Sequence, residues 1–227
     1  MNVTYESIDE ALECGYPSLV PILISTYGDE TCIEAYDSLK SETEQIIDRF
    51  GDRLFSKEAI DYIDSLFEPY VNSLGYYREI SGKYRWYLLY EADGLDSVPL
   101  NFGTGACRLT CDHFVYENCT HFDLNELLDK GLLTYVCLCE SRIVALATIN
   151  ETFDVDAPAE LTVECAVQYR NKGYGCAVLC ALTRDLLSKN KKTVYVTSRY
   201  NRASVALAKK CGFVLKGKIY AYTAFKD

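Results

Sequence analysis

Two kinds of apolar pattern follow each other in the C-terminal half of the chain. Residues 161–167 (Leu-Thr-Val-Glu-Cys-Ala-Val) are apolar and β-branched, which predicts a strand. Residues 176–187 instead repeat apolar or small side chains every three or four positions, a helical spacing. A second β-branched run covers 193–197, and a second helical run covers about 201–211. The pattern therefore predicts two strand–helix repeats, with a glycine-containing turn inside the first.

Helical spacing is also found in residues 1–78. One helix is expected from about residue 30 to residue 50, with Gly51 as its stop signal. A second is expected after Ser56, a residue suited to capping, and before Gly75. Pro69 falls inside this second run and is expected to kink or split it. The second run carries one apolar stripe: Ile60, Ile63, Phe67, Tyr70 and Leu74.

The middle of the chain reads as short strands around one short helix. Residues 84–90 are rich in aromatic and aliphatic side chains and predict a strand. Asp123 is expected to cap a short helix, and residues 133–140 and 143–150 are expected to form a hairpin about Ser141-Arg142. Residues 107–110 and the tail from 212 to 225 supply further strands.

Composition and charge exclude some classes of protein. No apolar run approaches the length of a membrane span, and no basic then apolar leader opens the chain, so a cytoplasmic protein is expected. Residues 1–100 hold 20 of the 33 acidic residues and 7 of the 23 basic ones. Such an acidic half disfavours nucleic acid as a partner. An acidic solvated surface is the first explanation for it, and attraction of a cationic substrate is the alternative. The 11 cysteines are an odd number in a long chain, which argues against a disulfide scaffold.

The turn between residues 167 and 176 carries the strongest chemical signal. Gly173 and Gly175 open a predicted helix, and Arg170 and Lys172 place two cations beside it. Glycines let backbone N–H groups approach an anion, and the start of a helix adds partial positive charge. A phosphate or pyrophosphate site is one interpretation, and a tight turn with solvated basic side chains is the other.

Two motifs in order resemble the GNAT superfamily of acyl-CoA-dependent N-acetyltransferases. Arg170-Asn-Lys-Gly-Tyr-Gly175 is similar to the family's Arg/Gln-x-x-Gly-x-Gly/Ala turn, and residues 201–213, with Asn201 and Ser204 before Gly-Phe, resemble its closing motif. The variant Ser-x-x-Leu-Ala-x-Lys-x-Gly-Phe is similar to a bacterial subgroup of the family. The resemblance covers about residues 106–227. It implies an α/β (α+β) fold with a mixed, mostly antiparallel sheet flanked by helices.

The resemblance also implies a domain division and a cofactor. Residues 104–227 would form the acetyltransferase domain. Residues 1–103 are expected to form a mainly helical domain with one or two strands, and their position before this core and their acidity suggest the hypothesis that they cover the acceptor side and set specificity. The cofactor would be acetyl-CoA (CoA). Its implied binding residues are Cys165, Ala166, Val167, Arg170, Lys172, Gly173, Tyr174, Gly175, Cys176, Asn201 and Ser204.

The residues that would transfer protons are less clearly marked. Members that use a carboxylate on this strand place it at the position of Leu161, and members that use a tyrosine place it at the position of Ala208. Glu164 and Glu160 are the candidate bases here, and strand alternation puts both on the face opposite to Cys165. A surface carboxylate with a basic partner is the equal alternative for Glu164. Tyr200, Tyr220 and Tyr222 are possible acids on nearby elements, and Tyr220 and Tyr222 are the ones selected.

Both histidines of the chain fall in a cysteine-rich stretch. Its pattern is Cys107-x3-Cys111-x-His113-x5-Cys119-x-His121. Zinc accepts such ligands, but the spacing fits no common zinc site, so we expect ordinary core and loop residues and no metal.

The sequence thus predicts transfer of an acetyl group from acetyl-CoA to a primary amine of a small molecule or a peptide. A catalytically inactive acyl-CoA-binding sensor or interaction module is the alternative, favoured by Leu161 and Ala208. A membrane partner is not expected, and the oligomeric state is open.

Overall fold

The computed structural model describes residues 1–78, 85–100, 105–150 and 157–226. The chain divides into two units. The first unit contains residues 1–89, 198–200 and 216–227, and the second contains residues 90–197 and 201–215. Strands β5 (Trp86–Ala92) and β12 (Phe213–Lys226) each have residues in both units. The predicted domain boundary between residues 103 and 104, and Tyr84 of the predicted strand 84–90, lie outside the described residues.

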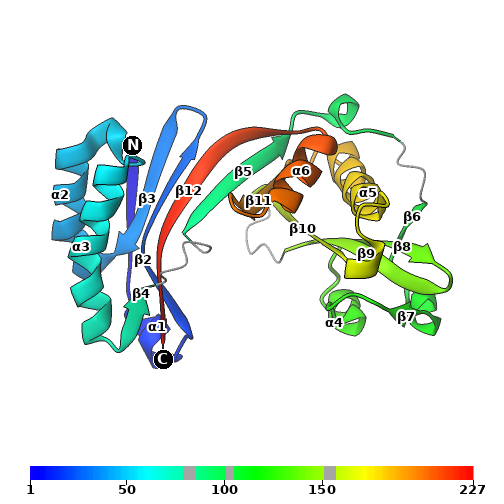
Figure 1. Ribbon diagram of the computed structural model, residues 1–227, viewed down its shortest axis with the longest axis horizontal. Helices are drawn as coiled ribbons and strands as arrows, with labels where there is room; N and C mark the ends of the chain where they lie inside the picture. Colours follow the sequence, from blue (N-terminus) through cyan, green and yellow to red (C-terminus); the bar gives the residue numbers. More distant parts are fainter. Residues whose placement is uncertain (79–84, 101–104, 151–156, 227) are drawn as a thin grey trace. The chain divides into compact units, whose positions relative to one another are not determined.

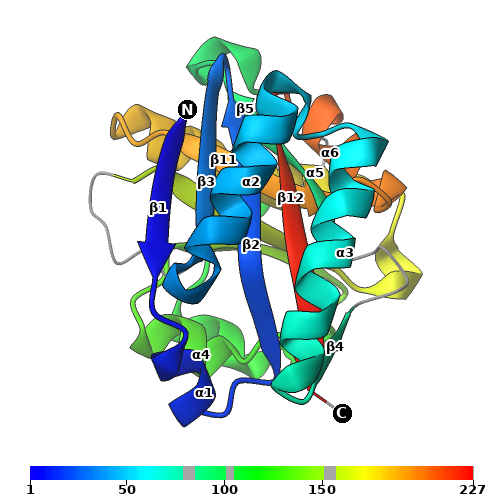
Figure 2. The same cartoon turned by 90° about the vertical axis from the view of Figure 1, so that its left-hand side faces the viewer.

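The first unit is a sheet with two helices on one face (Figure 2). Its strands follow the order β1-β3-β2-β12, and β4 pairs with β12. β1 and β3 are parallel, whereas β2 pairs antiparallel with both β3 and β12. The elements are β1 (Asn2–Glu6), α1 (Asp9–Glu13), β2 (Ser18–Tyr27), β3 (Glu30–Tyr36), α2 (Lys40–Phe50), α3 (Lys57–Ser73) and β4 (Tyr76–Arg78), with 3-10 turns at Asp37–Leu39 and Gly51–Arg53.

The mainly helical character expected of residues 1–103 is therefore corrected, since β1, β2 and β3 are strands. The helix expected over residues 30–50 begins only at Lys40, because Glu30–Tyr36 form β3. In this strand Ile33 and Ala35 are buried and Glu34 between them is exposed, the period of two that a sheet imposes. Ile33 and Tyr36 are also three positions apart, a spacing that a helix would share.

The second predicted helix is confirmed in its start and its end. The Ser56 side chain caps α3 by accepting from the Ala59 N–H (3.1 Å), and Gly75 follows its last turn with φ +79°. Ile60, Ile63 and Phe67 are buried in the core of the first unit, as the apolar stripe predicts. Of the two effects expected of Pro69, a kink or a split, the split is wrong, because α3 continues through Pro69 to Ser73.

The second unit is a mostly antiparallel sheet with helices on both faces, which confirms the expected fold class (Figure 1). Its strand order is β11-β10-β9-β8-β6, and the short β7 pairs with β9. The helix α5 packs on β8, β9 and β10, whereas α4 packs on the other face against Val136 and Leu146. The predicted hairpin is confirmed as β8 and β9, with Glu140 and Ser141 in its turn.

The second unit contains the following elements: β6 (Ala106–Arg108), β7 (Glu117–Asn118), α4 (Leu124–Asp129), β8 (Thr134–Cys139), β9 (Arg142–Ile149), β10 (Ala159–Cys165), α5 (Tyr174–Ser188), β11 (Thr193–Ser198, whose last residue belongs to the first unit) and α6 (Arg202–Lys210), with 3-10 turns at Leu95–Ser97, Cys111–Val115 and Val167–Tyr169. Among the described helices of both units, none combines the length and the apolar character needed to cross a bilayer.

Candidate functional site

The parallel strands β10 and β11 pair over only two residues. Ala159 pairs with Thr193 and Glu160 with Val194, after which β10 stays paired with β9 as far as Cys165. Beyond the point where the two strands part, Val163 and Cys165 of β10 and Tyr195 of β11 line a pocket of about 520 Å³. That volume lies in the range of small-molecule sites.

The glycine turn forms one end of this pocket. Asn171 (φ +62°) and Gly173 (φ +92°) both adopt left-handed backbone conformations, and Gly173 is the N-cap of α5. The first N–H groups of a helix have no acceptor within the helix, and Gly173 has no side chain that could accept from them. Alternating backbone conformations of this kind turn successive N–H groups toward one point, where an anion binds.

Cationic side chains surround the same turn. Arg170 lines the pocket, and its Nε donates to the Cys165 carbonyl (3.1 Å), which fixes the guanidinium beside the end of β10. Lys210, from the last turn of α6, also lines the pocket. Lys172 does not line it; its ammonium lies over the ring of Tyr169, 5.3 Å from the centroid. The electrostatics thus favour a phosphate-bearing ligand at the start of α5.

Helix α6 supplies the opposite wall. The Asn201 side chain caps it by accepting from the Ser204 N–H (3.1 Å), and both residues line the pocket. Burial raises the pKa of the Tyr195 phenol above its usual value, and the nearby Ser204 side chain, the smaller effect, lowers it. Tyr195 therefore stays protonated at neutral pH, with its hydroxyl held in the pocket wall. No motif in the sequence distinguishes Tyr195 from the other tyrosines among the 19 of the chain.

Successive side chains of β10 point to opposite faces of this strand. Val163 and Cys165 approach Gly175 of α5, so their side chains face that helix. Glu164, which also lines the pocket, lies between them and alternates to the other face of the strand, as the sequence predicts for a strand without a bulge. There its carboxylate accepts from two groups of His121: the backbone N–H (3.0 Å) and the ring Nδ1.

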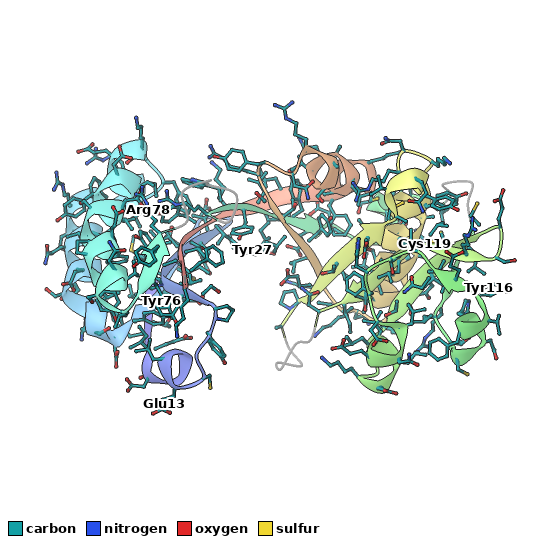
Figure 3. All side chains as sticks on the ribbon, turned by 60° about the horizontal axis from the view of Figure 1, so that its bottom comes forward. Glu13, Tyr27, Tyr76, Arg78, Tyr116 and Cys119 are labelled. Atoms are coloured by element: carbon teal, nitrogen blue, oxygen red, sulfur yellow. The ribbon has the colours of Figure 1, made fainter. Side chains whose placement is uncertain are left out.

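The sequence marks His121 only as a possible metal ligand in the cysteine-rich stretch. It lies two residues after Cys119, which Figure 3 labels with Tyr116 in the segment that leads to α4. Its imidazole is 92% exposed, whereas the Glu164 side chain is 16% exposed. A half-buried carboxylate that holds an accessible imidazole is the arrangement of a general base and its orienting group.

A pair of cysteine thiols lies beside the anion turn. Cys176 is in the first turn of α5 and lines the pocket, and Cys211 follows α6. A hydrogen bond from the Cys211 thiol, with help from Lys210, lowers the pKa of Cys176 to about 7 despite its burial. The same contact raises the pKa of Cys211, because only one of the two thiols can ionise easily.

Most, but not all, of the residues that the sequence predicts to bind the cofactor line the pocket. Cys165, Arg170, Gly173, Tyr174, Gly175, Cys176, Asn201 and Ser204 line it. Ala166 and Val167 do not, because β10 ends at Cys165: Ala166 donates to the Val144 carbonyl (2.9 Å) and Val167 begins a 3-10 turn. Glu160 also lies away from the pocket, at the start of β10, where burial raises its pKa.

Tyr220 and Tyr222, the candidate acids, do not lie at the pocket. Both are fully buried on the part of β12 that belongs to the first unit, because that strand leaves the second unit after Leu215. Burial raises the pKa of both phenols. Tyr220 donates to Asp64 (3.2 Å) and accepts from Arg85 (2.7 Å). The structure therefore does not bring either tyrosine to the pocket.

The cysteine–histidine stretch has a different arrangement from a metal centre. His113 Nε2 contacts the Cys107 thiol (3.2 Å), and its Nδ1 faces Thr110 (3.0 Å). His121 bonds to Glu164 instead of to a cysteine. Within the described ranges, three or more Cys, His, Asp or Glu side chains do not gather in a way that could hold a metal ion.

Comparison with known proteins identifies a family for part of the chain. Residues 104–213 match the acetyltransferase (GNAT) family. No curated protein sequence matches the chain.

Similar solved structures include a GNAT-family protein from Novosphingobium aromaticivorans DSM 12444 (16% identity, TM-score 0.48), with 63% of this chain and 65% of that chain covered. A GNAT-family acetyltransferase from Colwellia psychrerythraea (14% identity, TM-score 0.49) aligns over 62% of this chain and 55% of that chain. A GCN5-related N-acetyltransferase-like protein from Streptococcus suis 89/1591 (18% identity, TM-score 0.48) aligns over 75% and 68%, respectively. This chain thus spans less than two thirds of the length of the first two.

Proposed function

Because residues 104–213 match the acetyltransferase (GNAT) family, we propose that this protein transfers an acetyl group from acetyl-CoA to a primary amine of a small molecule or a peptide. The observation that carries the proposal is the pocket of the second unit, which is lined by the anion-binding turn, the buried Tyr195 phenol and Glu164, the residue that contacts the exposed His121 ring. Acyl transfer to an amine needs these three functions: a held donor, a proton acceptor and a proton donor.

The residues around the start of α5 fit the phosphates of CoA. Backbone N–H groups from Lys172 to Cys176 would hold the pyrophosphate, with Arg170 and Lys210 as charge partners. The gap between β10 and β11, with Val163 and Cys165 on one side, fits the pantetheine arm. Acetyl-CoA would supply an activated thioester, and the chain's own groups would orient it and move protons.

Proton removal from the amine is assigned to His121. The ring donates from Nδ1 to Glu164, which leaves Nε2 as the acceptor for the ammonium proton. Glu164 then stabilises the imidazolium that forms. Glu164 is thus a positioning residue, and His121 carries the proton.

Tyr195 is assigned the opposite role. Its phenol is protonated at neutral pH, is held by Ser204 and lines the pocket, so it can donate a proton to the departing CoA thiolate. This assignment replaces the tyrosine that other members place at the position of Ala208, which is fully buried here.

A specificity role for residues 1–103 is part of the same proposal. Its support is the acidity of that part of the chain, which suits a cationic acceptor. Deletion of residues 1–100 is not a clean test, because β12 would lose its partner β2. Exchange of exposed acidic residues of α2 for glutamine leaves the sheet intact, and a change in acceptor preference is the expected readout.

Calorimetric titration with acetyl-CoA and with CoA tests the cofactor site. Lys210 and Lys209 are adjacent in the last turn of α6, but only Lys210 lines the pocket. We expect Lys210→Glu to weaken CoA binding about tenfold or more, and Lys209→Glu to change it less than about twofold. Equal effects of the two variants would contradict the site, and absence of binding to the folded wild-type protein would contradict the function. Binding without turnover on any amine would favour the sensor instead.

A further inference from the structure

A second pocket, of about 470 Å³, lies entirely within the first unit. It is formed by the start of α3, the first residues of β5, part of β12 and Arg199. The residues that define its chemistry are Phe55, Lys57, Ile60, Trp86, Arg199 and Lys218. None of them belongs to the proposed acetyl-transfer site.

The charge of this pocket is opposite to that of the chain. The protein has a formal net charge of −10, yet Lys57, Arg199 and Lys218 line the pocket, and the described residues of its lining include no Asp or Glu. Within the described residues, these three cations have no ion pair. All three cations are exposed, and with no carboxylate among the described residues of the lining they give the pocket a positive potential that favours an anion.

Arg199 is held in position before any ligand arrives. Its guanidinium lies over the ring of Trp86 (4.9 Å to the centroid) and over that of Tyr200 (4.8 Å). Its backbone N–H donates to the Trp86 carbonyl (3.0 Å). Stacking occupies the faces of the guanidinium and leaves its in-plane N–H groups for a bidentate acceptor such as a carboxylate or phosphate.

Apolar and aromatic side chains complete the pocket. Trp86 packs between Phe55 (6.0 Å between ring centroids) and Tyr220 (5.1 Å), and Ile60 contributes a buried aliphatic surface. Because these rings are fixed by one another, the wall is preformed. We propose that this pocket binds a small organic anion whose carboxylate or phosphate meets Arg199 and the two lysines, and whose aromatic body packs against Phe55 and Trp86.

The chain offers a built-in reporter for this site, because Trp86 is its single tryptophan. Phenylacetate and phenyl phosphate are titrated into the full-length protein while tryptophan emission is recorded, with phenylacetamide as the uncharged comparator. The proposal expects a saturable change in emission with at least one of the two anions and at least about tenfold weaker binding of the amide. The relative affinity of the two anions identifies the preferred acidic group.

Arg199→Gln is the decisive variant, and Lys226→Gln is the control. Lys226 is a cation of β12 that does not line the pocket. We expect Arg199→Gln to weaken anion binding about tenfold and Lys226→Gln to leave it unchanged. If Arg199→Gln does not fold, Lys57→Gln, at the exposed start of α3, replaces it. Equal binding of the amide, loss of binding in the control alone, or no saturable change with either anion overturns the proposal.

Discussion

His121 and Glu164 are 43 residues apart in the chain, and the carboxylate of Glu164 accepts from both the backbone N–H and the ring of His121. The contact joins the loop before α4 to the face of β10 that is turned away from α5. The two faces of one strand therefore carry different tasks, with cofactor contacts on the α5 side and the proton-accepting pair on the other.

His121→Ala and Glu164→Gln are both expected to lower kcat by about 10²–10⁴. The double variant should lose little more than either single one, because the two residues act as a unit. Affinity for CoA should stay within about twofold of wild type, since both variants leave the anion-binding turn, Arg170 and Lys210 unchanged. Steady-state kinetics and calorimetry measure the two quantities.

Chemical rescue separates proton transfer from a structural role. The His121 ring is 92% exposed, so added imidazole can reach the space that His121→Ala vacates. A concentration-dependent recovery of kcat, absent in Glu164→Leu, is expected. Additive losses in the double variant, together with no rescue, would contradict the pair as a catalytic unit.

Tyr195→Phe removes the proposed proton donor without a change in shape. We expect kcat to fall about 10- to 100-fold with CoA binding unchanged. Because burial raises the pKa of this phenol above its usual value, the wild-type enzyme should lose activity from this group only at strongly alkaline pH, where the phenol deprotonates. Tyr200→Phe is the control, as Tyr200 is 52% exposed and outside the pocket. Equal kcat in wild type and Tyr195→Phe would remove the assignment.

Local motifs were predictable from the sequence. The turn around Gly173 and the cap at Asn201 each need only a few consecutive residues, so their spacing fixes their structure. The pairing of His121 with Glu164 was not predictable, because it depends on how the loop before α4 packs on β10. The nearest signal was the position of both histidines in one cysteine-rich stretch, which was weighed only as a metal site and rejected on its spacing.

The positions of Tyr220 and Tyr222 were not predictable for a different reason. The sequence shows a final strand, but not that β12 runs for 14 residues and leaves the second unit after Leu215. Tyr220 and Tyr222 are therefore part of another core. Likewise, apolar spacing alone did not separate the strand at Glu30–Tyr36 from the helix that follows it.

Cys176 should react with an alkylating agent in a pH-dependent way. Its pKa is lowered to about 7, so the thiolate fraction, and with it the rate of iodoacetamide labelling, should rise as the pH passes through about 7. Cys211→Ala removes the hydrogen bond and should move this midpoint upward. CoA should slow the labelling, because Cys176 lines the pocket. Mass spectrometry of the labelled peptide gives the rate, and a wild-type midpoint that Cys211→Ala leaves unchanged would contradict this account.

Asp64 should be the most costly acidic residue to replace in the first unit. Its carboxylate contacts Arg85 and Arg78 (2.8 Å to the latter, labelled in Figure 3 on β4) and accepts from Tyr220. Asp64→Asn leaves two largely buried guanidinium groups without their carboxylate, so the free energy of unfolding should fall by about 3 kcal/mol.

Asp61→Asn, one turn earlier on the exposed face of α3, is the matched control and should change the free energy of unfolding by less than about 0.5 kcal/mol. Urea unfolding followed by tryptophan emission measures both variants, because Trp86 lies 5.1 Å from the ring of Tyr220 and therefore reports on the first unit. Similar losses in the two variants would mean that the Asp64 contacts add nothing beyond those of an ordinary surface carboxylate.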